Sequence, residues 1–261
     1  MADNSKIQWT THTWNPWQGC KKVSPGCKFC YMYRDKKRFQ QDPTVVMRSQ
    51  PSTFTKPFSW HEPGLVFTCS WSDWFIEQAD EWRSEAWDII RKTPHLTYQI
   101  LTKRPERIAS NLPPDWGNGY PNVWIGVSCE NQKTFNERVP ILADIPARVR
   151  FLSIEPLLEH IRFSGLLTVG KPKKLLSSID WVIVGGESGN DAGEFRFRPC
   201  SVEWMESIVN ACLVLNIPAF VKQMGTDIAT RHRMTDRHGG NIDEFPGSLQ
   251  IREFPHNYTI Q

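Results

Sequence analysis

The chain has 261 residues, of which 39% are hydrophobic and 23% are charged, and its formal net charge is +3. This composition excludes an intrinsically disordered chain, and the length suits one large α/β domain. The polar N-terminus lacks the apolar core of a signal peptide, and no apolar run is long enough for a membrane span. We therefore expect a cytoplasmic protein that makes no membrane contact. Seven cysteines in a reducing compartment favour metal binding or catalysis over disulfides.

The positive charge is concentrated near the N-terminus. Residues 1–60 contain ten Lys or Arg and three Asp, a local net charge of +7, which leaves −4 for the rest of the chain. A basic segment of this kind can bind an anion such as a nucleic-acid backbone. It can equally form a solvated surface, so composition leaves both interpretations open.

Seven short apolar runs, separated by helical stretches, predict a parallel sheet. Each run is rich in Val, Ile, Phe or Trp, as expected of strands buried on both faces. The predicted strands are Ile7–Trp14, Leu65–Cys69, Thr97–Leu101, Val123–Val127, Val149–Ile154, Trp181–Val184 and Ala219–Lys222. The predicted helices are Cys30–Gln41, Ala79–Lys92, Pro105–Asn111, Asn131–Ala143 and Val202–Leu215, the last with Ser201 as its N-cap.

The regular alternation of strands and helices indicates repeated βα units. We expect an α/β fold, a partial TIM-like (β/α)6–7 barrel with parallel strands. It would form a single domain over residues 1–261, with a C-terminal extension over about residues 225–261.

Polar side chains follow six of the predicted strands. In barrels and open α/β sheets, the C-terminal ends of the strands form the functional site. We therefore expect one shared pocket lined by residues at these ends. The candidates are Cys69, Ser70, Ser72, Asp73, Lys103, Arg104, Ser128, Cys129, Glu130, Asn131, Glu155, Gly185, Gly186, Glu187, Ser188 and Gln223.

Three cysteines near the N-terminus, Cys20, Cys27 and Cys30, have the spacing Cys-x6-Cys-x2-Cys. Soft thiolates select iron–sulfur clusters or zinc. The last two cysteines can reach one metal centre from a tight turn, and Pro25-Gly26 supplies a sharp bend. Three ligands would leave one iron of a [4Fe–4S] cluster open to a further ligand. Structural zinc is the competing interpretation, but it normally needs four protein ligands.

The residues around these cysteines resemble the radical S-adenosylmethionine (SAM) superfamily. Phe29 is the aromatic residue that typically precedes the third cysteine, and Tyr31 follows it. The opening from residue 7 to residue 31 is similar to a phage-associated family of radical-SAM-like proteins. The similarity continues in Leu101-Thr-Lys-Arg-Pro105, Ser153-Ile-Glu-Pro156 and Gly185-Gly-Glu-Ser-Gly189. The usual superfamily spacing has three residues between the first two cysteines, whereas this chain has six. We call residues 15–31 the cluster loop.

The resemblance implies that the three cysteines hold a [4Fe–4S] cluster whose open iron chelates SAM. An electron from an external donor would then cleave SAM to a 5′-deoxyadenosyl radical, which abstracts hydrogen from the substrate. Phe29 and Tyr31 would flank the cofactors. The superfamily usually binds the SAM amino group beyond the second strand, where Ser70, Ser72 and Asp73 lie.

The resemblance also suggests roles for residues at the other strand ends, according to their positions in the sequence. The ribose hydroxyls would lie near Ser128, Glu130 or Asn131, at the fourth strand end. Lys103 or Arg104 could bind the SAM carboxylate or a substrate phosphate. Further pocket residues would be the Glu155 carboxylate and the Gly185-Gly186-Glu187 turn, whose glycines permit close approach to adenine or ribose. A tight βα turn explains those glycines equally well.

The segment Phe195-Arg196-Phe197-Arg198 alternates aromatic and basic residues. This pattern suits stacking and phosphate contacts with single-stranded or flipped bases, with Arg196 and Arg198 as substrate residues. An edge strand with outward-facing arginines is the other interpretation.

A cysteine could donate a hydrogen atom to a substrate radical, as in spore photoproduct lyase, a DNA-repair member of the superfamily. Cys200, Cys129 and Cys69 are the candidates, and each could instead be a small buried hydrophobe. The leading hypothesis is a radical SAM enzyme that repairs or modifies a nucleic acid or nucleotide. The alternative is a non-catalytic nucleic-acid-binding protein stabilised by zinc or an iron–sulfur cluster. The sequence leaves the oligomeric state open.

Overall fold

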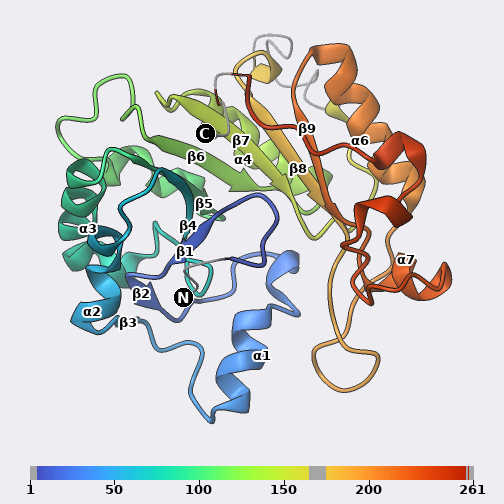
Figure 1. Cartoon of the computed structure of the whole chain (residues 1–261), viewed down its shortest axis with the longest axis horizontal. Helices are drawn as coiled ribbons and strands as arrows, with labels where there is room; N and C mark the ends of the chain where they lie inside the picture. The colour runs from blue at the N-terminus through green and yellow to red at the C-terminus, as the bar shows by residue number, and fades with distance from the viewer. Residues whose placement is uncertain (1–4, 165–174, 257, 259–261) are drawn as a thin grey trace.

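The computed structural model, which describes residues 5–164, 175–256 and 258, contains a curled parallel sheet (Figure 1). Every neighbouring pair of strands in this sheet is parallel. Because β1 and β9 are the outer strands and do not pair with each other, the sheet forms a half-barrel, which confirms the predicted partial TIM-like barrel. The strand order is β1 (His12–Trp14), β4 (Gly64–Thr68), β5 (Leu96–Thr102), β6 (Val123–Ser128), β7 (Val149–Ile154), β8 (Trp181–Gly185) and β9 (Ala219–Gln223).

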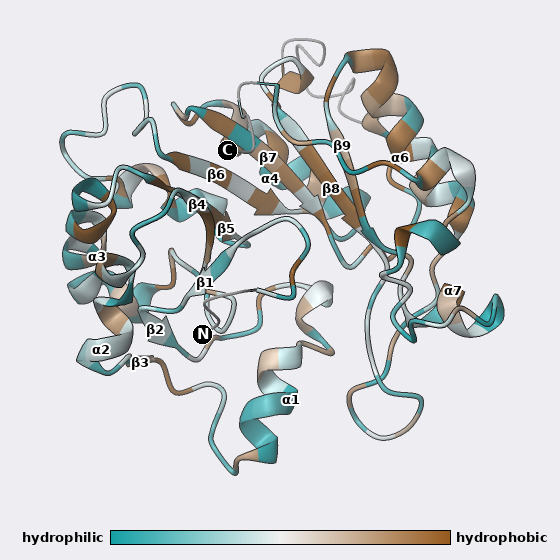
Figure 2. Cartoon of the chain, viewed as in Figure 1, coloured by the Kyte–Doolittle hydropathy of each residue, from teal (hydrophilic) through white to brown (hydrophobic). Residues whose placement is uncertain are grey.

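Three longer helices follow strands of the sheet and cover its outer face, as expected of βα units: α3 (Asp80–Lys92), α4 (Gln132–Ala143) and α6 (Val202–Leu215). A second, two-stranded antiparallel sheet joins β2 (Trp17–Gln18) to β3 (Met47–Arg48). The shorter helices are α1 (Tyr31–Arg38), α2 (Pro51–Phe54) and α7 (Thr226–Arg231). Figure 2 shows apolar residues concentrated on β6 to β9, whereas α1 is mainly polar.

Alternation along the strands divides the core into two parts. On β7, Leu152 and Ile154 face outward and join the large core between the sheet and the helices. Phe151 faces inward and packs in a smaller core that includes Trp181. Ser153 is two residues further along the same inward face. The inside of the half-barrel is therefore apolar over most of its depth and becomes polar toward the C-terminal ends of the strands.

Local sequence explains the start of α4. The Asn131 side chain accepts a hydrogen bond from the Thr134 amide at 2.9 Å, and the Thr134 hydroxyl accepts one from the Asn131 amide at 3.2 Å. This capping box satisfies two of the amides that a helix start leaves unpaired, a contribution of about 1 kcal/mol. It also fixes the direction in which the chain leaves β6.

Three sequence predictions differ from the structure. Pro105–Asn111 forms two short 3-10 turns instead of one helix, and the Asn111 side chain bonds the Arg107 carbonyl at 2.8 Å. The first strand covers only His12–Trp14, because the chain turns at the hydrogen bond from the Thr10 amide to Ile7. Ser201 occupies the N-cap position of α6, but its hydroxyl bonds Glu203 instead of a helix amide.

The elements β2, β3, α2 and α7 are too short to leave a periodic signal, and the sequence did not predict them. Within the described residues, we find no helix with the length and apolar character needed to cross a bilayer.

Candidate functional site

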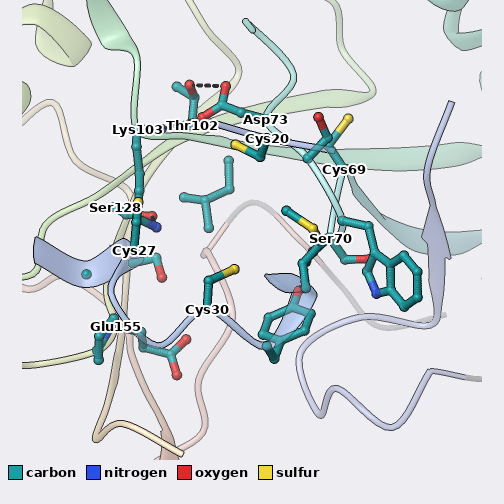
Figure 3. A pocket seen from close by; sticks show the side chains of 18 of the residues that line it. Cys20, Cys27, Cys30, Cys69, Ser70, Asp73, Thr102, Lys103, Ser128 and Glu155 are labelled. Atoms are coloured by element: carbon teal, nitrogen blue, oxygen red, sulfur yellow. Dashed lines mark hydrogen bonds between the residues drawn. The ribbon is translucent and has the colours of Figure 1, made fainter. Parts of the chain in front are cut away.

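A cavity of about 470 Å³ opens at the C-terminal ends of the strands. Residues at or just after the C-terminal ends of β4, β5, β6, β7, β8 and β9 line it, together with the cluster loop from the N-terminal region. Figure 3 shows Cys20, Cys27 and Cys30 around this cavity, with Lys103, Ser128 and Glu155 on its wall. The shared pocket expected at the strand ends is therefore present, and the three-cysteine motif forms part of its wall.

The cluster loop brings its cysteines to the pocket through tight local structure. Pro25–Cys27 forms a 3-10 turn, and Cys30 is the N-cap residue of α1. Burial raises the pKa of the Cys30 thiol, while amides of the first turn of α1 act in the opposite direction. Burial and the Asp73 carboxylate raise the pKa of the Cys20 thiol to about 12, against the lowering influence of Arg104. In the metal-free chain these two thiols are protonated at neutral pH, and binding a metal must displace their protons.

A first anchor of the loop comes from the end of β5. Arg104 is buried, and its guanidinium nitrogens lie 3.8 and 3.9 Å from the Cys20 sulfur. The same group donates to the Lys21 carbonyl at 2.8 Å and pairs with Asp73 at 3.1 Å. Asp73 also accepts from the Thr102 hydroxyl at 2.7 Å, so its carboxylate is held by the sheet.

A second anchor comes from the end of β6. The fully buried carboxylate of Glu130 accepts a hydrogen bond from the Ser24 hydroxyl at 2.7 Å. Arg138 donates to the same carboxylate at 3.2 Å, and the Lys103 ammonium lies 3.7 Å away. Burial alone would raise the pKa of Glu130, but these two cations outweigh it and lower the pKa below its ordinary value. Glu130 is thus an ionised support beneath the loop.

A third anchor comes from the segment after β8. Arg198 donates to the Pro25 carbonyl at 2.9 Å, and its guanidinium lies over the Phe29 ring, 5.3 Å from the centroid. Glu187 holds Arg198 by accepting from its backbone amide at 2.9 Å and from Nε at 2.8 Å. Three separate strand ends therefore fix the position of one loop.

Most of the residues expected from sequence at the site lie on the pocket wall. These are Cys20, Cys27, Phe29, Cys30, Tyr31, Cys69, Ser70, Ser72, Asp73, Lys103, Arg104, Ser128, Glu155, Gly186, Glu187, Ser188 and Gln223. The Tyr31 hydroxyl donates to the Ser70 carbonyl at 2.5 Å, which joins α1 to the end of β4. The Glu155 carboxylate pairs with Lys222 of β9 at 3.1 Å.

The other predicted site residues are not part of the pocket wall: Cys129, Glu130, Asn131, Gly185, Arg196, Arg198 and Cys200. Asn131 caps α4, and Glu130 and Arg198 support the loop from outside the cavity. Cys129 and Cys200 are buried, and burial raises the pKa of both thiols. Arg196 is exposed.

Sequence reasoning missed several wall residues, including Trp9, Trp71, Ser153 and Lys222. Ser153 could have been found from alternation, because it shares the inward face of β7 with Phe151. Trp71 had no such signal, since its position depends on a turn. The carbonyl of Trp71 accepts from the Gly19 amide at 3.0 Å, and its own amide donates to the Asn15 side chain at 2.8 Å.

The donor set of the loop fits an iron–sulfur cluster. All three cysteines are free thiols, and they share one cavity wall. Within the described residues, no three His, Cys, Asp or Glu side chains converge closely enough to hold a single metal ion. A [4Fe–4S] cluster does not need such convergence, because each thiolate binds a different iron atom. Three soft ligands from one anchored loop match that requirement.

Comparison with known proteins gave a family match and a structural match. The family model described as "Protein of unknown function (DUF5131)" matches residues 4–249. No curated protein matches the chain. A solved structure that matches is a spore photoproduct lyase mutant with bound AdoMet and dinucleoside spore photoproduct. It has 12% sequence identity and a TM-score of 0.48, over 80% of this chain and 62% of that chain. The present chain thus spans about 62% of the length of that protein.

Proposed function

We propose that this chain, which belongs to the family described as protein of unknown function (DUF5131), is a radical SAM enzyme. Cys20, Cys27 and Cys30 would hold a [4Fe–4S] cluster, and the adjoining cavity would bind SAM. The observation that carries this proposal is the placement of three free thiols on the wall of one cavity at the C-terminal strand ends.

When bound together, a cluster and SAM supply a carbon-centred radical that removes a hydrogen atom from a substrate. The role of the chain is to bind, orient and shield. Lys103 presents a cation on the cavity wall, with its ammonium 3.0 Å from the Ser128 hydroxyl, and suits a carboxylate or phosphate. Glu155 presents a carboxylate, already paired with Lys222, that suits an ammonium group. The wall therefore offers partners for both charged ends of an amino acid.

The apolar interior below the cavity would limit the access of water. Trp9, Phe67 and Leu101 line the cavity, and Trp9 and Phe67 pack edge to face with ring centroids 4.7 Å apart. Apolar residues at this position would exclude water, which would otherwise compete for the radical.

We infer that the substrate is a nucleic acid or nucleotide. The exposed residues of the cluster loop include Lys21, Lys22 and Lys28, of which Lys21 also lines the cavity. Helix α1, which follows directly, adds further cations and is mainly hydrophilic (Figure 2). A phosphate backbone is the polyanion that such a surface would attract. Reduction would require an external one-electron donor.

The experiment is anaerobic reconstitution with iron and sulfide, followed by incubation with SAM and dithionite. We expect a brown protein that forms 5′-deoxyadenosine, and we expect Cys27→Ala to abolish that product. Cys212→Ala is the matched control, because Cys212 is buried in α6, among the core residues. A colourless protein with one firmly bound zinc ion would instead support the alternative, a non-catalytic nucleic-acid-binding protein.

A further inference from the structure

Arg104 contacts the Cys20 sulfur in addition to the loop backbone at Lys21. The Arg104 guanidinium lies 3.8 and 3.9 Å from the Cys20 sulfur, within reach of a hydrogen bond to sulfur. Cys27 has a neutral neighbour instead, the Ser24 hydroxyl, at 3.8 Å. Cys20 therefore differs from Cys27, because the hydrogen-bond partner of Cys20 carries a full positive charge.

The charge of Arg104 is partly balanced by Asp73, which lies 3.1 Å from it. Asp73 is buried and accepts from the Lys103 amide at 2.9 Å and from the Phe75 amide at 3.0 Å. These amides fix the carboxylate, and the carboxylate in turn fixes the plane of the guanidinium. Burial of both groups weakens solvent screening, so their fields act strongly on the nearby sulfur.

We propose that Arg104 and Asp73 set the reduction potential of the cluster through Cys20, an inference that rests on the proposed function. One electron enters the cluster from an external one-electron reductant, and no bond forms or breaks in that step. The added electron increases negative charge on the sulfur atoms. A cation that donates hydrogen bonds to one of them stabilises the reduced form and raises the potential, whereas a nearby carboxylate lowers it.

The chain provides a matched control pair on the same segment. Arg107 donates to the Phe75 carbonyl at 2.8 Å and pairs with Asp80 at 2.7 Å. It resembles Arg104 in being a guanidinium–carboxylate pair after β5, but it does not line the cavity. A change at Arg107 therefore tests for general effects of removing an arginine from this turn.

The test is a potentiometric titration of the reconstituted protein, followed by electron paramagnetic resonance of the reduced cluster. We expect Arg104→Gln to shift the midpoint to a more negative potential and Asp73→Asn to shift it in the opposite direction. Arg104→Lys keeps the charge but loses the planar fork, so its midpoint should lie between those of the wild type and Arg104→Gln. Arg107→Gln should leave the midpoint unchanged.

The outcomes separate this inference from the proposed function. If the wild-type protein assembles no cluster, the proposed function fails and this inference with it. A cluster whose midpoint is the same in the wild type and Arg104→Gln overturns this inference alone. Shifts of equal sign in Arg104→Gln and Asp73→Asn also overturn it, because they would indicate a rearranged loop and not a charge effect. Loss of iron from both Arg104 variants overturns it as well, since the role of Arg104 would then be limited to holding the loop in place.

Discussion

Ser24 and Glu130 are 106 positions apart in the sequence, yet the Ser24 hydroxyl donates a hydrogen bond of 2.7 Å to the Glu130 carboxylate. This contact links the cluster loop to the end of β6. It is short because the carboxylate is ionised, and charge-assisted hydrogen bonds are about twice as strong as neutral ones. The loop thus rests on a charged support inside the protein.

Removing that support should destabilise the whole domain. Glu130→Ala leaves Arg138 buried without its carboxylate partner, and breaking a buried pair in this way costs about 3–5 kcal/mol in the free energy of unfolding. Ser24→Ala should cost less, because only one donor is lost. Urea denaturation followed by circular dichroism measures both changes.

The control for this prediction is Glu137→Ala on α4, the helix that carries Arg138. Glu137 pairs with Lys133 at 3.9 Å on the exposed face of α4, and such pairs contribute about 0–1 kcal/mol. Equal losses in Glu130→Ala and Glu137→Ala would show that the buried carboxylate is not the support that the contacts indicate.

Gly26 tests how closely the loop must approach that support. A Cβ added at Gly26 would lie 2.4 Å from Cγ of Glu130 and 2.6 Å from its Oε1. The loop of Gly26→Ala must therefore lift away from the sheet, and we expect a several-fold lower iron content after reconstitution. Gly247→Ala is the control, since a Cβ there meets no atom within 4 Å. Iron content that is the same in both variants would contradict the prediction.

The sequence predicted the sheet well but not these anchors. The strands β4 to β9 were recognisable because buried parallel strands consist of short, continuous apolar runs, and Val149–Ile154 matches the predicted bounds. Periodicity also indicated which residues follow each strand, and so the existence of a pocket. It could not show that Glu130 faces Ser24, since that contact depends on how the sheet curls and how a loop folds across it.

The same limit applies to the basic residues of the 195–198 segment. Alternation placed Arg196 and Arg198 in one role, as substrate residues. In the structure Arg198 is held by Glu187 and bonds the Pro25 carbonyl, whereas Arg196 is exposed. Two arginines two positions apart thus have different surroundings, which no pattern of residue types could reveal.

This difference gives a paired prediction. Arg198→Ala should lower iron content after reconstitution, because the loop loses a hydrogen bond and a cation over Phe29. Arg196→Ala should leave iron content unchanged and weaken binding of single-stranded nucleic acid, with a smaller dependence on salt. Metal analysis and fluorescence anisotropy at several salt concentrations measure the two effects. The reverse assignment of effects would refute the division of roles.

His238 makes the stability of the region around α7 depend on pH. Nδ1 of His238 lies within hydrogen-bond distance of the Thr226 hydroxyl, at 2.9 Å, and that hydroxyl also accepts from the Gly189 amide at 3.2 Å. Burial lowers the pKa of His238, and the Arg237 cation lowers it further, against the opposing effect of Asp236. The folded protein therefore favours the neutral ring.

Because the pKa is lower in the folded state than in the unfolded state, the unfolded chain binds the additional proton first as the pH falls. The stability that the neutral His238 ring contributes is fully present above its unfolded-state pKa of about 6.5. It declines as the pH falls through that value toward the lower pKa of the folded state. We expect His238→Gln to remove this part of the pH dependence, since an amide does not titrate in this range. His61→Gln, at an exposed histidine, is the matched control and should leave the slope unchanged. The measurement is the free energy of unfolding in urea between about pH 5 and pH 8. A slope in His238→Gln as steep as that of the wild type would assign the acid sensitivity to another group.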